Sequence, residues 1–181
     1  RRGELSAIMG PSGSGKTTLL MAVAGRVAFR GRVHVDGEAA PRGVSALLGS
    51  RFALVPQEDI MYRRLTVEEN IWLSAAFRLP RRARRHGGID RAVSRVVEQM
   101  RLSHVQGVSV GDDDVRGVSG GERKRTNIAL ELVADPDCIF VDEPTTGLDA
   151  AAAKEVVRCI GEIVQRERVT VACIVHQPRH G

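Results

Sequence analysis

One glycine-rich segment restricts the possible folds of this chain more than any other, and it runs from Gly10 to Thr17. Its sequence, Gly-Pro-Ser-Gly-Ser-Gly-Lys-Thr, fits the phosphate-binding pattern G-x-x-x-x-G-K-[ST]. The apolar run at 5–9 predicts a short buried strand before it, and the run from Thr18 predicts the start of a helix. A chance match in a glycine-rich turn is a poor alternative, because the pattern has its meaning in this strand–loop–helix context.

The chemistry of this segment suits a chain of phosphate groups. The glycines let the backbone curl tightly and turn successive N–H groups inward. The helix N-terminus adds further free N–H groups and a partial positive charge. Lys16 would reach the β- and γ-phosphates, and the hydroxyl of Thr17 would hold Mg²⁺. We therefore expect a nucleotide site at the start of the first helix.

The length and composition fit one globular domain, with room for a subdomain. The chain has 181 residues, of which 43% are hydrophobic, and a net charge of +5. One Trp, one Tyr and four Phe leave little for bases to stack on, which argues against binding of single-stranded nucleic acid. The sequence shows no membrane-spanning run, no signal peptide and no zinc-like cysteine spacing, so we expect a soluble domain in a reducing compartment.

The positive charge is partly local, because six arginines fall between Arg78 and Arg91. A run of this kind, with Pro80 and paired glycines at its end, is usually a solvated loop. The alternative is a surface that contacts acidic lipid or a partner loop.

Strand-like and helix-like segments alternate along the chain. Expected strands lie at 31–37, 52–56, 138–141 and 169–175, and expected helices at 66–77, from Asp90, at 119–132 and at 150–166. This alternation predicts an α/β fold with a mainly parallel sheet and flanking helices.

A second phosphate-binding element is predicted at Ser119-Gly120-Gly121-Glu122. The spacing of Ser119 and Glu122 fits a helix capping box, which is the plainer interpretation. A capping box does not require two consecutive glycines, however, and these would expose N–H groups at a helix N-terminus. Two such sites in one protein suggest that the phosphates of a nucleotide are bound from two sides.

Two acids follow an apolar strand at Cys138–Val141. Ligands bind at the carboxyl edge of open α/β sheets, where Asp142 would suit Mg²⁺ and Glu143 would orient and polarise a water molecule. The alternative is an ordinary strand that runs into a polar turn.

Three further polar residues stand at strand ends or helix starts. Gln57 follows a core strand and could contact a metal or its water, which alone is a weak signal. Asp149 could simply cap the next helix. His176 ends the last strand at the same sheet edge as Asp142, where a histidine is usually structural but could donate to a γ-phosphate oxygen.

In this order, the motifs resemble the nucleotide-binding domain of ABC ATPases over essentially the whole chain. The Ser-Gly-Gly-Glu signature just upstream of the Asp-Glu strand is specific, because other phosphate-loop families lack it. A resemblance to the eukaryotic G (White-type) subfamily is carried by the sequences at 118–125, 142–149, 55–59, 65–70 and 176–178.

The resemblance implies a P-loop NTPase (RecA-like) fold, with an inserted α-helical signature subdomain at about 62–132. Residues 1–181 would be one nucleotide-binding domain that is truncated at both ends, with its adenine-stacking residue outside the chain. The resemblance implies Glu143 and His176 as catalytic residues. Its metal site would comprise Thr17, Gln57 and Asp142. Its nucleotide-binding residues would be Gly10, Ser12, Gly13, Ser14, Gly15, Lys16, Thr17, Thr18, Gln57, Ser119, Gly120, Gly121, Glu122 and Asp149.

The resemblance also implies partners and a function. Two nucleotide-binding domains, identical or different, would pair head to tail and hydrolyse Mg·ATP between them, without nucleic acid. A transmembrane domain in the same full-length chain would export a lipid, sterol or other amphipathic compound, with this domain on the cytosolic face of the membrane. The main rival is a soluble ABC ATPase that acts on ribosomes or nucleic acid; a second is a module that binds nucleotide without turnover.

Overall fold

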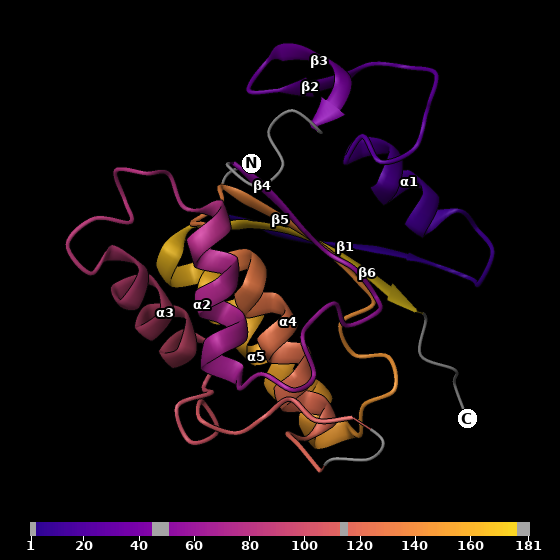
Figure 1. Ribbon diagram of the computed structural model, residues 1–181. Coiled ribbons are helices and arrows are strands. Elements are labelled where there is room, and N and C mark those ends of the chain that lie inside the picture. Colours follow the sequence, from indigo (N-terminus) through magenta and orange to yellow (C-terminus); the bar gives the residue numbers. More distant parts are fainter. Residues whose placement is uncertain (1–2, 45–50, 113–115, 177–181) are drawn as a thin grey trace.

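The computed structural model in Figure 1 describes residues 3–44, 51–112 and 116–176. Its strands are β1 (Leu5–Gly10), β2 (Val33–Val35), β3 (Glu38–Val44), β4 (Phe52–Val55), β5 (Cys138–Asp142) and β6 (Thr170–His176). Its helices are α1 (Lys16–Val23), α2 (Val67–Arg78), α3 (Gly88–Gln99), α4 (Gly120–Leu132) and α5 (Ala150–Glu167). Each expected helix and strand is present in the expected order, but β3, which follows the Asp36-Gly37 turn, was not predicted.

The main sheet has four parallel strands in the order β1-β6-β5-β4. Gly10 at the end of β1 lies opposite His176 at the end of β6, and Asp142 at the end of β5 lies opposite Ile174. The parallel register therefore brings the carboxyl ends of these strands, with the segments that follow them, to one edge of the sheet. This is the edge where open α/β folds bind ligands.

Helices cover both faces of this sheet, as expected for parallel strands. Figure 1 shows α1 on one side and α2 to α5 on the other. Alternation along β5 explains this arrangement: Phe140 packs with Leu20 of α1, whereas Ile139 and Val141 join the larger core beneath α2 to α5. The larger core includes Val93, Val96 and Val97 of α3, together with Met100 just after it.

The first strand differs from the prediction in its burial. β1 was expected to be buried, but Leu5 is 45% exposed and Met9 is 58% exposed. The reason is position, because β1 is the outer strand of the main sheet and pairs within it with β6 alone. The phosphate loop therefore begins at the sheet's margin and not at its centre.

Local signals set the boundaries of several elements. Thr66 and Ser119 each form a complete capping box at the start of α2 and α4, and the box of α4 is the one that the spacing of Ser119 and Glu122 predicted. The β2–β3 hairpin turns at Asp36 and Gly37, which both have positive φ angles, as an Asp-Gly hairpin turn requires.

Hydropathy sets one limit on the helices. Within residues 3–44, 51–112 and 116–176, no helix combines the length and apolar character needed to cross a bilayer.

Candidate functional site

The phosphate loop leaves its backbone N–H groups without side-chain competition. Gly15 is the N-cap of α1 with a φ of 86°, and it offers no side chain to cap the helix. Gly13 also has a positive φ, 78°, which side chains of L-residues rarely adopt. The first-turn N–H groups of α1 are thus available to an anion at the point where the helix dipole is positive.

The side chain of Lys16 is held by the loop itself. Its Nζ donates hydrogen bonds to the carbonyl oxygens of Gly10 and Pro11, both at 2.9 Å. Lys16 is buried despite its charge, and it lines the cavity described below. The two carbonyls therefore fix a cation inside the curl of the loop, where a phosphate chain would meet it.

A contact between two side chains joins the loop to the central strand β5. The hydroxyl of Thr17 donates to Oδ1 of Asp142 at 3.3 Å. Asp142 is buried at the end of β5, while Thr17 is the second residue of α1. Two residues that are 125 positions apart, both predicted to bind Mg²⁺, thus come together at the carboxyl edge of the sheet.

Glu143 follows Asp142 in an unusual backbone conformation. Its φ is 48°, in the left-handed region that a residue with a side chain seldom occupies. Its N–H donates to the carbonyl of Ile174 at 3.2 Å, and Thr146 Oγ1 donates to its Oε2 at 3.0 Å. The neighbouring strand and the following turn therefore both position Glu143. Strained backbone conformations of this kind are often found at functional sites.

One polar cavity of about 390 Å³ collects most of these groups. Its lining residues are Ser12, Gly13, Gly15, Lys16, Thr17, Thr18, Gln57 and Glu143. The loop, the amide of Gln57 after β4 and the carboxylate of Glu143 after β5 thus face one space. A phosphate chain held by the loop would have a carboxylate and a carboxamide within the same cavity.

Gly10, Ser14 and His176 are placed beside this cavity by the backbone. Gly10 ends β1 and gives its carbonyl to Lys16. Ser14 lies in the turn, where its N–H donates to the carbonyl of Pro11 at 3.3 Å. His176 ends β6 directly opposite Gly10 in the strand register, so the sheet edge predicted for it is confirmed.

The signature segment is a separate, internally satisfied unit. The hydroxyl of Ser119 accepts the N–H of Glu122 at 3.3 Å, and Oε2 of Glu122 accepts the N–H of Ser119 at 2.8 Å. Oε1 of Glu122 also lies 2.8 Å from Nε2 of His104. Burial raises the pKa of Glu122, but the hydrogen bonds from Ser119 and His104 outweigh it, so the net pKa is lowered.

The signature glycines are packed against residues 148–152, which follow Asp142 and Glu143 in the sequence. A Cβ on Gly121 would lie 2.9 Å from Cβ of Ala152 on α5, and one on Gly120 would lie 3.3 Å from Leu148. The plainer interpretation of Asp149 as a helix cap is confirmed, because its Oδ1 accepts the N–H groups of Ala151 and Ala152 at 2.9 Å. The glycines thus permit a close approach that a larger residue would prevent.

The structure does not bring the signature to the phosphate loop of the same chain. Ser119, Gly120, Gly121, Glu122 and Asp149 are not among the residues that line the phosphate cavity. Gly120 instead lines a second cavity of about 410 Å³, which Gln57 also borders. Gln57 is therefore the residue that the two cavities share.

Two residues that shape this site were not predicted from the sequence. Lys124 is buried, and its Nζ donates to the carbonyl of Gln57 at 2.7 Å and pairs with Asp59 at 2.9 Å. Thr146, as above, bonds Glu143. One sign was present in the sequence, because Lys124 is a charged residue within the predicted signature helix. The pattern alone did not identify Gln57 or Asp59 as its partners.

The basic segment is divided by its contacts. Arg78 pairs with Glu131 at 2.6 Å, and Arg84 donates to the backbone carbonyls of Leu79 and Phe77. Arg78 thus joins the end of α2 to α4, and Arg84 holds the following loop to the end of α2, so part of the charge run is structural.

Comparisons with known proteins agree on one family. The family profile described as ABC transporter matches residues 1–146. ABC transporter G family member 7 of Arabidopsis thaliana is 43% identical over 98% of this chain and 24% of its own length. The broad substrate specificity ATP-binding cassette transporter ABCG2 of Sus scrofa is 41% identical over 97% of this chain and 26% of its own length. The chain thus spans about a quarter of the length of these relatives.

Solved structures share the fold at lower identity. A dimeric ATP-binding cassette in a post-hydrolysis state, bound to ADP and Pi, is 24% identical with a TM-score of 0.78, over 98% of this chain and 76% of that one. The protein cbiO1 from Clostridium perfringens, part of an ABC transporter complex, is also 24% identical with a TM-score of 0.79, over 98% and 68%. The predicted P-loop NTPase fold is confirmed.

Proposed function

This chain belongs to the ABC transporter family as an ATP-binding domain, and we propose that it hydrolyses Mg·ATP to drive export by a larger membrane protein. The observation that carries the proposal is the contact between Thr17 and Asp142, with Glu143 next in sequence and facing the same cavity as Thr17. It joins a phosphate-binding loop to a carboxylate at the sheet edge, which is the combination that phosphoryl transfer to water requires.

The donor set fits Mg²⁺. A hydroxyl, a carboxylate and a carboxamide oxygen, from Thr17, Asp142 and Gln57, are the hard oxygen ligands that this ion prefers. Thr17, Asp142 and Gln57 would hold the ion, which when bound would neutralise negative charge that develops in the reaction. The chain's own contribution is to hold these three oxygen donors on one edge of the sheet.

The remaining roles follow from position. Lys16 and the loop N–H groups bind the β- and γ-phosphates, together with Ser12 and Thr18, which line the cavity, and Ser14 in the same turn. Glu143, oriented by Thr146, accepts a hydrogen bond from the attacking water and polarises it. His176, at the same edge, donates to a γ-phosphate oxygen. Positioning and charge stabilisation then do most of the work, since this reaction needs little covalent help from protein.

The signature completes the site of a second copy. Because Ser119 to Glu122 do not line their own chain's phosphate cavity, we propose that two domains pair head to tail. The N–H groups of the signature would then meet the γ-phosphate held by the partner's loop, and closure would exclude water from both sites. Asp149, beside the signature, would lie at the same interface.

The transport role rests on the family. G family members are among the relatives, and the chain spans about a quarter of their length. We propose that the full-length protein is a half-transporter on the cytosolic face of a membrane, exporting a lipid, sterol or other amphipathic compound. Gln57 and the helical segment at about 62–132 would pass closure to its transmembrane domain.

The test is the size of the Glu143→Gln variant with and without Mg·ATP. We expect the variant to bind ATP, to convert from monomer to dimer and to hydrolyse at least a hundredfold more slowly, since one well-aimed group is worth about 3 kcal/mol. Ser119→Arg in the same background should prevent the dimer. Wild-type turnover by Glu143→Gln would overturn the catalytic assignment.

A further inference from the structure

Arg101 occupies a backbone position where glycine is the usual residue. It follows the end of α3 with a φ of 54°. Its N–H donates to the carbonyl of Glu98 at 3.0 Å, and the N–H of Leu102 donates to that of Val97 at 2.9 Å. These two bonds form a Schellman motif, whose left-handed residue is most often glycine because a side chain there is disfavoured. An arginine at this point therefore calls for a compensating role of its side chain.

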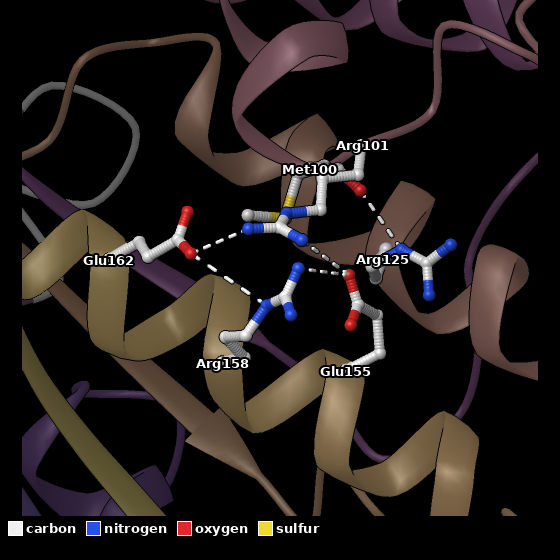
Figure 2. A network of polar contacts seen from close by, with 6 residues as sticks. All are labelled: Met100, Arg101, Arg125, Glu155, Arg158 and Glu162. Carbon is white, nitrogen blue, oxygen red and sulfur yellow. Dashed lines mark hydrogen bonds and ion pairs between the residues drawn. The ribbon is translucent and has the colours of Figure 1, made fainter.

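That side chain reaches a different helix. Figure 2 shows the guanidinium of Arg101 extending toward α5, where it contacts Glu155 and Glu162. The distances are 3.2 Å to Oε1 of Glu155 and 2.6 Å to Oε1 of Glu162. Because these glutamates lie seven positions apart on one face of α5, a single planar guanidinium bridges two turns of the helix.

A second contact joins the end of α3 to the signature helix α4. Nε of Arg125 on α4 donates to the carbonyl of Met100 at 2.9 Å, in a buried bond. Met100 immediately precedes Arg101 and is itself buried (Figure 2). The end of α3 is thus held to α4 through the backbone and to α5 through the side chain of Arg101.

These contacts control how two functional segments meet. Gly121, in the first turn of α4, packs against Ala152, in the first turn of α5, and Asp149 caps α5 just before it. Ala152, Glu155 and Glu162 lie at helical spacing on one side of α5, so the contact of α5 with Arg101 fixes the same face that Gly121 touches. A shift of α5 along this face would move Asp149 relative to the signature.

We infer that Arg101 is a positioning residue, which locks α5 to the end of α3 and thereby holds Asp149 and the signature in one rigid unit for ATP turnover. The inference rests on the proposed function, in which this unit faces the partner's phosphates. Within the part of the chain that the structure describes, the polar contacts of Arg101 go to Glu98, Glu155 and Glu162 and to no predicted nucleotide-binding residue, so its effect is on closure and turnover and not on the affinity of the phosphate loop. Small displacements of such a unit are costly, because a misplacement of about 1 Å can slow a reaction about a hundredfold.

The experiment uses the full-length protein and two substitutions that separate backbone from side chain. Arg101→Gly removes the bridge but suits the positive φ, whereas Arg101→Ala removes the bridge and keeps the strained backbone. We expect both to lower kcat for ATP at least fivefold, with the KM for ATP unchanged within about twofold. Arg101→Gly should fold at least as well as Arg101→Ala, so its loss of turnover would not reflect unfolding.

The matched control is Arg158→Gln. Arg158 contacts the same two glutamates from within α5, at 3.5 and 3.8 Å, and so connects nothing to α3. We expect it to keep kcat within twofold of the wild type, while Glu155→Gln with Glu162→Gln should reproduce Arg101→Gly. Wild-type kcat in Arg101→Gly, or an equal loss in Arg158→Gln, would overturn the inference.

Hydrogen exchange tests the lock without reference to activity. Arg101→Gly should speed amide exchange in the first turns of α5 at least fivefold, and Arg158→Gln should not. Unchanged exchange would overturn the inference even if turnover fell. The two hypotheses can fail separately. If Arg101→Gly speeds exchange as expected but Glu143→Gln hydrolyses ATP at the wild-type rate, the positioning role of Arg101 stands and the proposed function is wrong.

Discussion

The two glycine-containing loops at helix N-termini differ in how their donors are used. The phosphate loop ends in Gly15, which offers no side-chain cap, so the N–H groups of α1 remain free for a ligand. The signature ends in a closed capping box between Ser119 and Glu122, so part of its hydrogen-bonding capacity is already satisfied. The first loop is built to bind by itself, whereas the second has a fixed shape that a ligand on another molecule can meet.

Their surroundings differ in the same sense. The phosphate loop faces a cavity that Gln57 and Glu143 complete within one chain. Gly121 packs tightly against Ala152 of α5, with no space for a Cβ, and Gly120 packs against Leu148 just before α5. In the proposed function, binding and closure are carried by separate loops, so substitutions should separate the two steps.

The largest expected effect comes from Lys16→Ala. Removing the cation that the carbonyls of Gly10 and Pro11 hold inside the loop should weaken ATP binding at least a hundredfold, since charge-assisted bonds to phosphate are the strongest in the site. The measurement is nucleotide affinity by equilibrium titration. Lys154→Ala, at an exposed position of α5, is the control and should bind ATP normally. Retained affinity in Lys16→Ala would show that the phosphate loop does not dominate binding.

Gly121→Ala should affect the other step. Its Cβ would lie 2.9 Å from Cβ of Ala152, closer than real Cβ contacts, so the signature or α5 must shift. We expect ATP affinity to stay within about twofold while ATP-dependent dimerisation and turnover fall about tenfold. The control is Gly161→Ala, where an added Cβ meets nothing within 4 Å. If Gly121→Ala weakened binding as much as Lys16→Ala, the two loops would not be separable.

Much of this arrangement could be predicted from the sequence. The phosphate loop, the strand that ends at Asp142 and the capping boxes of Thr66 and Ser119 all follow from local patterns, and the structure confirms each element. These features depend on residues within a few positions of one another. Their signals therefore survive in the sequence without knowledge of the fold.

What could not be predicted depends on distant partners. Exposure of β1 follows from its outer place in the sheet, which its apolar sequence does not reveal. Lys124 meets Gln57 across 67 positions and Arg101 meets Glu162 across 61, and neither pair has a spacing rule. The left-handed backbone conformation of Glu143 could not be predicted from the sequence either, because glycine or asparagine is the usual residue in that conformation.

Ser119→Ala should have a smaller effect, on stability as well as closure. Losing the side-chain half of a capping box typically costs about 1 kcal/mol. Thr66→Ala removes the equivalent half from α2, where no nucleotide-binding residue is predicted, and is the matched control. We expect similar losses in free energy of unfolding by denaturant titration, but reduced ATP-dependent dimerisation in Ser119→Ala alone. Equal dimerisation in both variants would mean that the cap of α4 is structural only.

The smallest expected effect is a pH dependence carried by Glu122. Burial opposes its ionised form, but the bonds from Ser119 and His104 favour it more strongly, so its pKa is lowered in the folded state. The unfolded chain then binds more protons, so this stabilisation is present above the ordinary glutamate pKa of about 4.3 and is lost as pH falls through the lower folded value.

Glu122→Gln isolates that charge, because glutamine also completes a capping box. The variant should lose less free energy of unfolding than the wild type between about pH 6 and about pH 3, as measured by denaturant titration. Glu69→Gln makes the same change in the box of α2, where no histidine contributes. If both variants showed the same acid response, the cap of α4 would owe nothing to His104. A larger response in Glu122→Gln than in the wild type would contradict the lowered pKa itself.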